Sequence, residues 1–342
     1  MVNLAGRLTF GRRAMVALAG VAMVALSGCS VDPQTTLAPQ SGFADKIQFL
    51  LKLTFFMGAG VFVVVEGVLV YVLVRYRRRR GRENEMPVQV HGNNRLEITW
   101  TIIPTILLAV IAFFTTQTIF ATEAPAPANA MKVTVIGHQW WWEFQYPTLG
   151  ITTADEVHMP VNKTVSFTLE SADVMHSFWL PRLGGKRDVI PNHQNSLWWT
   201  PNTIGVTPGQ CGQYCGTSHA NMRLLGVVQS QADFNTWVAA QKAPPVAPAA
   251  GTLAAAGLAT FKSEPCIGCH TIQGVSSGTI GPNLTHLASR SIIAGGILKN
   301  NPHDLAAWLH NPPGEKPGSI MPNLHLTNQQ ITDLVAYLTT LK

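Results

Sequence analysis

The sequence predicts a multidomain membrane protein that combines a hairpin of two transmembrane helices, an all-β domain and a small all-α domain. Two long apolar segments flank a cluster of arginines. Short runs rich in Val and Thr follow with period-two alternation, and a Pro- and Ala-rich segment separates them from a helical C-terminal stretch. With 46% hydrophobic and 12% charged residues, the 342-residue chain is also apolar for a soluble protein.

Residues 1–29 have the pattern of a secretory signal peptide. Three arginines precede an apolar core at 14–26, which is followed by LSGC. The LSGC sequence also looks like a bacterial lipobox, which implies cleavage before Cys29 and acylation of its thiol. The alternatives are an ordinary signal peptide cleaved elsewhere and an uncleaved first span. The apolar core is short, which favours a signal.

The transmembrane hairpin is predicted over residues 45–122. The apolar runs 53–74 and 98–120 are each long enough to cross a bilayer as a helix. The connection 75–96 carries the arginine cluster, which is typical of the cytoplasmic side, so both ends of the mature chain are expected outside the cytoplasm. Apart from this cluster and the signal, basic and acidic residues nearly balance, and the net charge of +6 does not indicate nucleic-acid binding.

Residues 130–240 are predicted to form the all-β domain, and its most informative stretch is the loop CGQYCGTSHANM. Cys211, Cys215, His219 and Met222 offer soft or borderline ligands that suit copper. A mononuclear blue-copper loop needs one cysteine, whereas two thiolates can bridge two copper ions. His176, about 35 residues upstream, is the leading candidate for a further imidazole ligand. A disulfide between the two cysteines and a zinc site are the alternatives.

The Pro- and Ala-rich segment 241–251 is predicted to be a linker to a C-terminal domain at 252–342. The motif CIGCH is typical of covalent haem c attachment, with Cys266 and Cys269 as thioethers and His270 as the proximal ligand. A redox or zinc site is the alternative for this cysteine pair. Met321 is the predicted distal ligand because it is the only methionine after Met222, and His325 is its competitor.

These motifs resemble subunit II of the haem-copper cytochrome c oxidases over nearly the whole chain. The resemblance implies a cupredoxin-like copper domain and a class I cytochrome c domain. It also implies a binuclear copper centre whose ligands are His176, Cys211, the carbonyl of Gln213, Cys215, His219 and Met222. The family usually has Glu at the carbonyl position, where its carboxylate also reaches a magnesium ion shared with subunit I. Gln213 lacks that charge, so we do not carry the magnesium site over.

The resemblance assigns roles to further residues. Trp140 in GHQWWWEFQY corresponds to the point where electrons enter from cytochrome c, with packing of the rings as the alternative. Glu97 corresponds to a residue near a proton-path entrance in subunit I, or is an interfacial carboxylate satisfied by water and headgroups. Asp173 and Asp188 match acids that would attract a basic cytochrome, unless they serve in turns. Glu66, inside the first span, is expected to pack against a partner subunit.

The resemblance implies the electron-entry subunit of a caa-type terminal oxidase in the bacterial inner membrane, with both soluble domains on the outer side. A soluble cytochrome c or a membrane-bound donor would supply electrons, and subunit I and subunit III would be its partners in the lipid bilayer. The linker would hold the haem domain near copper at an effective concentration of roughly millimolar. The alternatives are a subunit of a copper-containing nitric oxide reductase and a membrane-anchored copper delivery protein. A quinol oxidase subunit would lack the copper ligands.

Overall fold

The computed structural model describes residues 20, 34–77, 86 and 88–342. The predicted signal peptide with Cys29, and residues 78–85 and 87 of the predicted cytoplasmic connection, lie outside the described residues. The chain divides into two compact units, Met1–Thr35 and Thr36–Lys342. The helices and strands described below belong to the second unit.

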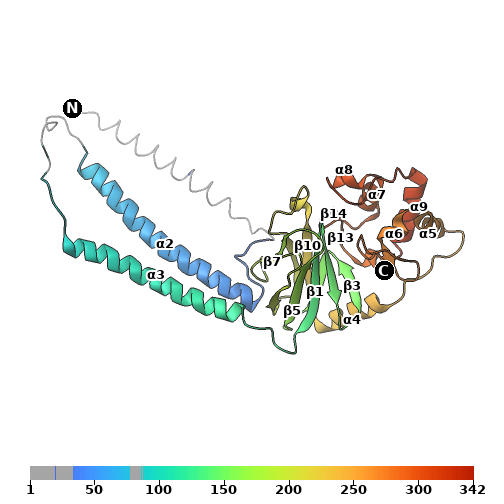
Figure 1. Cartoon of the computed structure of the whole chain (residues 1–342), viewed down its shortest axis with the longest axis horizontal. Coiled ribbons are helices and arrows are strands. Elements are labelled where there is room, and N and C mark those ends of the chain that lie inside the picture. Colours follow the sequence, from blue (N-terminus) through green and yellow to red (C-terminus); the bar gives the residue numbers. More distant parts are fainter. Residues whose placement is uncertain (1–19, 21–33, 78–85, 87) are drawn as a thin grey trace. The chain divides into compact units, whose positions relative to one another are not determined.

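The hairpin consists of α2 (Gly42–Arg75) and α3 (Asn94–Thr122). Both helices are long and apolar enough to cross a membrane. They lie side by side (Figure 1), and the rings of Phe49 and Phe114 meet edge to face with centroids 5.3 Å apart. The Ser41 and Asn93 side chains accept hydrogen bonds from backbone N–H groups of the first turns, which fixes where the helices begin.

The membrane-distal ends of the hairpin are tied to the β domain, which we define as residues 131–242. The Trp198 indole N–H donates to the carbonyl of Ala124, just after α3, at 2.7 Å. Before α2, the side-chain oxygen of Gln40 accepts a hydrogen bond from the Thr207 hydroxyl at 2.7 Å. Hydrogen bonds therefore fix the segments on both sides of the hairpin to the β domain.

The β domain pairs a five-stranded sheet of order β3-β2-β1-β5-β8 with a three-stranded sheet of order β4-β10-β9, and a hairpin of β6 and β7 lies beside them. The strands are β1 (Met131–His138), β2 (Trp141–Tyr146), β3 (Ile151–Ala154), β4 (Glu156–Pro160), β5 (Val165–Ser171), β6 (His176–Phe178), β7 (Arg187–Val189), β8 (Asn195–Trp199), β9 (Gly205–Gln210) and β10 (Arg223–Gln229). β1 runs parallel to β5 and antiparallel to β2.

Alternation of side chains along the strands builds the core of this domain. In β1 the side chains of Val133 and Val135 are buried while their neighbours are partly exposed, as the period of two requires. The inward rings of Trp142, Phe167 and Trp199 are fully buried. After β10 the helix α4 (Gln231–Lys242) packs on the domain, and it continues two residues into the predicted linker.

The C-terminal domain, residues 253–342, is built mainly from α5 (Leu253–Ser263), α6 (Cys266–Cys269), α7 (Pro302–His310), α8 (Pro312–Glu315) and α9 (Asn328–Leu338) (Figure 1). Two short antiparallel strand pairs, β11 (Thr271–Ile272) with β12 (Ser276–Ser277) and β13 (Ile292–Ile293) with β14 (Leu298–Lys299), join the helices. The helices α5 and α9 cross at Gly257, where a Cβ atom would lie 1.9 Å from the carbonyl oxygen of Asp333. Only glycine allows so close an approach.

Candidate metal centre and haem cavity

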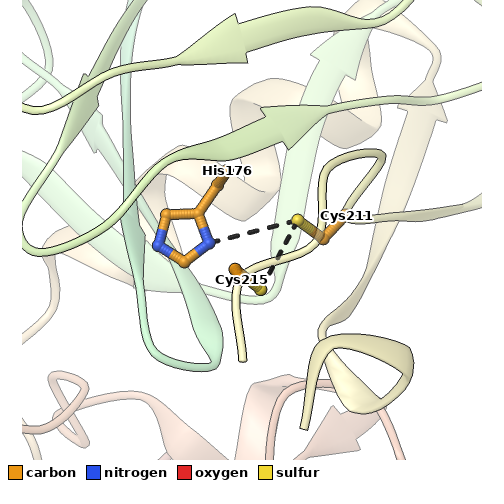
Figure 2. A group of neighbouring side chains, drawn as sticks. All are labelled: His176, Cys211 and Cys215. Carbon is orange, nitrogen blue, oxygen red and sulfur yellow. Dashed lines mark hydrogen bonds between the residues drawn. The ribbon is translucent and has the colours of Figure 1, made fainter. Parts of the chain in front are cut away.

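The two cysteines of the predicted copper loop lie close to His176 in the β domain (Figure 2). The loop between β9 and β10 carries both thiols, and the backbone N–H of Cys211 donates to the carbonyl of Met222 at 2.9 Å, which closes the loop. The Cys211 and Cys215 sulfurs are 3.8 Å apart, and Nδ1 of His176 lies 4.0 Å from the Cys211 sulfur. All three residues are buried.

The remaining predicted copper ligands surround the same two sulfurs. Nδ1 of His219 is 3.5 Å from the Cys215 sulfur, and the thioether sulfur of Met222 is 3.9 Å from it. The carbonyl oxygen of Gln213 lies 3.2 Å from the Cys211 sulfur. The loop thus brings two thiols, two imidazoles, one thioether and one carbonyl to one place, a donor set that fits copper because it is rich in sulfur and nitrogen.

His176 is oriented by a carboxylate on its far side. Its Nε2–H donates to Asp173 at 2.8 Å, which leaves Nδ1 free to face the thiols. Burial alone would lower the pKa of His176, but the hydrogen bonds and charges of Asp173 and Cys211 raise that pKa overall. Asp173 also accepts from the backbone N–H of Gln139 at 2.6 Å. Its role is therefore to position His176 and the start of the aromatic segment.

The two thiols ionise unequally. The hydrogen bond between the two thiols lowers the pKa of Cys211 to about 4 and raises the pKa of Cys215. A thiolate beside a thiol is a ready soft ligand. The sulfurs are 3.8 Å apart, far beyond the length of about 2.05 Å that a disulfide bond requires. The thioether of Met222 favours copper over zinc.

The CIGCH motif opens into an apolar cavity of the C-terminal domain. Cys266, Cys269 and His270 line the cavity together with Met321, and a second, adjoining cavity shares Cys266, His270 and Met321. Nδ1–H of His270 donates to the carbonyl of Pro282 at 2.9 Å, which leaves Nε2 available to a metal. Two thiols, an imidazole and a thioether around an apolar cavity fit a covalent haem, which Cys266 and Cys269 would attach and His270 and Met321 would hold. The competitor His325 is exposed.

Trp140 lies between the copper loop and this cavity. Its indole N–H donates to the carbonyl of Cys215 at 2.9 Å, and the Gln139 amide donates to the same carbonyl at 2.8 Å. The ring also lines the cavity that contains His270 and Met321, and it is only 8% exposed. Trp140 therefore contacts the cysteine loop on one side and the C-terminal domain on the other.

A cluster of charged residues at this junction was not singled out from the sequence. Asp155 and Glu156 come from the β domain, and Arg290 and Lys316 come from the C-terminal domain, all of them buried. Burial lowers the pKa of Lys316 to about 8, partly offset by the charge of Asp155. The sequence offers one weak signal, an acidic pair at the start of a β-rich run: Asp155 directly precedes β4, and Glu156 is the first of its five residues, all of them buried.

The structure gives the contacts or positions of three further residues whose roles the sequence left open: Glu97, Asp188 and Glu66. Glu97 accepts a hydrogen bond from the backbone N–H of Asn93 at 3.2 Å and so caps the start of α3. Asp188 lies in β7 opposite Ser177, next to the strand that carries His176. Glu66 is exposed on α2. The capping contact accounts for Glu97 without reference to proton transfer.

Known families match three segments of the chain. The transmembrane domain of cytochrome c oxidase subunit II matches residues 35–118, its periplasmic domain matches 148–230, and cytochrome c matches 254–342. Cytochrome c oxidase subunit 2 of Alkalihalophilus pseudofirmus is 38% identical over 324 residues, which cover 93% of this chain and 94% of that protein. The chain belongs to the cytochrome c oxidase subunit II family.

Other members and a solved structure are also similar. Cytochrome c oxidase subunit 2 of Bacillus sp. (strain PS3) is 36% identical over 347 residues, covering 96% of this chain and 97% of that protein. The periplasmic domain of subunit II of cytochrome oxidase (CoxB) of Bradyrhizobium japonicum is 30% identical, covers 34% of this chain and 97% of that chain, and has a TM-score of 0.34.

Family membership confirms the fold class expected from the sequence. This subunit II combines two apolar helices, a cupredoxin-like β domain and a C-terminal cytochrome c domain. The copper-type donor set and the CIGCH cavity together imply copper and haem as its cofactors. The chain is thus a component of an oxidase, and its two helices fit a membrane protein with an outer-side domain.

Proposed function

We propose that this subunit II is the electron-entry subunit of a respiratory terminal oxidase. Electrons would pass from its own haem c to a binuclear copper centre and then to subunit I, where oxygen is reduced to water. The bound haem and copper would supply the one-electron redox chemistry. The protein would supply ligands, fixed geometry and a dry path between them.

The copper pair would be held by one set of ligands: His176, Cys211, the carbonyl of Gln213, Cys215, His219 and Met222. The separations of 3.2 to 4.0 Å among these donor atoms support this assignment, because small movements would bring each of them to metal-bond distance. The β sheets and Asp173 hold the imidazole and the loop before any metal binds. Rigid ligands keep reorganisation between oxidation states small.

The haem would be attached through Cys266 and Cys269, and His270 and Met321 would hold its iron. The hydrogen bond from His270 to the Pro282 carbonyl supports this assignment, since it fixes the tautomer that leaves Nε2 free. A Cβ atom on Gly281 would lie 2.5 Å from the His270 ring, so glycine is needed for the imidazole to occupy this position. A thioether opposite an imidazole raises the reduction potential of the iron.

The observation that carries the proposal is the position of Trp140. This side chain is hydrogen-bonded to the carbonyl of Cys215 and lines the cavity around His270, so the two cofactor sites have one residue in common. An indole in that position would offer electrons a short route from the haem site to the copper site through its polarisable ring. Its burial keeps water out of the route.

We extend the proposal to the partners, the location and the remaining residues on the basis of family membership. Subunit I and subunit III would bind the hairpin in the bacterial inner membrane, with the β and C-terminal domains on the periplasmic side. A soluble cytochrome c or a membrane-bound donor would reduce the haem, and Cys29 would carry lipid. Glu97 would stand near a proton-path entrance of subunit I while it caps α3.

The test is oxygen uptake by the purified complex with reduced cytochrome c as donor. We expect uptake by the wild-type complex, loss of uptake in Cys215→Ser, and normal uptake in Glu170→Gln, whose carboxylate accepts a hydrogen bond from the exposed Gln194 amide away from the proposed cofactor ligands. Nitric oxide reduction without oxygen uptake would reassign the enzyme. Purification of the chain without a multi-span haem subunit would instead favour copper delivery.

A further inference from the structure

The C-terminal domain is docked on the β domain through a turn and a loop. The turn is residues 291–296, and the loop is residues 316–318. The backbone N–H of Arg223 donates to the carbonyl of Gly295 at 2.8 Å, and the Ser218 hydroxyl donates to the carbonyl of Pro317. Close to the linker, the Gln241 amide donates to the Ser289 hydroxyl at 2.9 Å. One of these contacts joins backbone to backbone and the other two involve side chains, and together they fix one orientation.

Two carboxylates of the β domain bind the turn. Asp155 accepts from the N–H of Trp142 with one oxygen and from the N–H of Gly295 with the other, each at 3.0 Å. Glu156 accepts from the N–H groups of Ser291 at 2.6 Å and Ile292 at 3.0 Å with the same oxygen. Charge-assisted bonds to backbone donors are short and directional, which suits them to hold a segment in register.

A lysine of the C-terminal domain in turn donates a hydrogen bond to the β domain. The Lys316 ammonium donates to the carbonyl of Trp140 and to the carbonyl of Ala294, the latter at 2.8 Å. Burial raises the pKa of Asp155, and the positive charges of Lys316 and Arg290 partly offset that rise. Opposite charges that are buried together stabilise each other, whereas either one alone is strongly unfavourable in a dry interface.

The linker does not impose this orientation. Between the end of α4 at Lys242 and the start of α5 at Leu253, the Pro- and Ala-rich residues 243–252 would reach roughly 30 Å if extended at about 3.1 Å per residue. The domain therefore has enough chain to leave and return. What holds it over Trp140 is the set of contacts around the acidic pair.

We propose that Asp155 and Glu156 are positioning residues that hold the C-terminal domain in one docked orientation over Trp140, so that electrons cross a fixed contact instead of awaiting collisions of a tethered domain. This inference rests on the proposed function, because it concerns the path from haem to copper. The linker alone would suggest a donor domain that moves freely on its tether, whereas these contacts hold the domain in place.

The test measures electron transfer from haem to copper in the purified oxidase complex after flash photoreduction of the haem by tris(bipyridine)ruthenium. In the wild type we expect a single rate that does not change with solvent viscosity. Asp155→Asn leaves Lys316 buried without a counter-charge, so we expect the rate to fall at least tenfold and to become viscosity-dependent. In Asp155→Asn/Lys316→Met the unpaired charge is gone, so part of the rate should return.

Two further variants complete the design. Glu156→Gln keeps the side-chain size and removes one charge, so it tests the proposal if Asp155→Asn fails to assemble. Glu170→Gln removes a matched charge elsewhere on the β domain and should behave as the wild type. The haem and copper absorption spectra should be the same in all variants, which separates docking from loss of a cofactor.

The outcomes distinguish the two proposals. Unchanged and viscosity-independent transfer in both Asp155→Asn and Glu156→Gln would overturn the positioning role while leaving the electron-entry function intact. Absence of any transfer from haem to copper in the wild-type complex would overturn the proposed function itself. A slow, viscosity-dependent wild-type rate would show that the domain is mobile and would also overturn the positioning role.

Discussion

Replacing Gly295 with alanine should loosen the docked C-terminal domain without touching any proposed cofactor ligand. Gly295 has a φ of +70°, a left-handed conformation that disfavours a side chain. A Cβ atom at this position would lie 2.1 Å from the Lys316 ammonium nitrogen and 2.4 Å from the carbonyl oxygen of Trp140. The ammonium can move, but the Trp140 carbonyl belongs to the backbone beside the copper loop.

The expected loss has two parts. The left-handed backbone costs about 1–2 kcal/mol for a residue with a Cβ atom. Overpacking against a rigid neighbour costs about 1–3 kcal/mol more. The second part alone, taken at about 2 kcal/mol, would reduce the ratio of docked to undocked domain roughly thirtyfold.

Gly274→Ala is the matched control. Gly274 lies in the same domain with a φ of +77°, yet nothing is within 4 Å of its added Cβ atom. It therefore carries the backbone cost without the clash. Flash-induced electron transfer in the purified complex should be slow and viscosity-dependent in Gly295→Ala and normal in Gly274→Ala. Equal rates in the two variants would refute the reasoning.

Three other changes test the sites and the fold. Cys215→Ser should abolish copper binding, measured by metal analysis of the purified complex, because a hydroxyl cannot replace a bridging thiolate. Gly257→Ala should destabilise the C-terminal domain by roughly 2 kcal/mol or more in thermal unfolding, because its Cβ atom would lie 1.9 Å from the Asp333 carbonyl oxygen. Glu156→Gln should lower the melting temperature at pH 7, with a difference from wild type that fades as the pH falls below about 4.5.

The sign of the pH effect follows from the contacts of Glu156. Burial would raise its pKa, but hydrogen bonds from His158 and Ser291 lower that pKa below the ordinary 4.5. A carboxylate with a lowered native pKa stabilises the fold above its unfolded pKa, and the contribution is lost as the pH falls through the native value. A difference from the glutamine variant that stayed constant down to pH 3 would contradict this account.

Each of the other two variants has its own control. Cys215→Ser should retain the haem spectrum, and full retention of copper would argue against a shared thiolate. For Gly257→Ala the control is Ala256→Gly, on the exposed side of the same helix, which should cost only about 1 kcal/mol from helix propensity. A milder effect at Gly257 than at Ala256 would mean that α5 and α9 separate easily.

The copper loop and the CIGCH motif were predictable because their chemistry is local in sequence. Cys211, Cys215, His219 and Met222 lie within one loop, and the structure brings their donor atoms together. His176 was predicted as the leading candidate for a further imidazole about 35 residues upstream, and the structure places it at the start of β6. The all-β and helical domains followed from periodicity, which alternating burial in β1 reflects.

The docking of the two domains could not be predicted in the same way. Asp155 and Gly295 are 140 positions apart, and neither lies in a motif or a periodic pattern. Lys316 in a Pro- and Gly-containing loop looks like an ordinary solvated cation, although the structure buries it. Contacts of this kind depend on how two finished folds meet, which no local spacing encodes. The orienting role of Asp173 was similarly open until its bond to His176 was seen.

The burial of Trp140 has a consequence for the choice of redox partner. While the C-terminal domain remains docked, a soluble protein has no access to an indole that is only 8% exposed. Under the proposed function, recognition of an external reductant would then fall to the outer surface of the C-terminal domain. Exchanging that domain for another of the same shape would change which reductant the complex accepts, with no change to the copper loop.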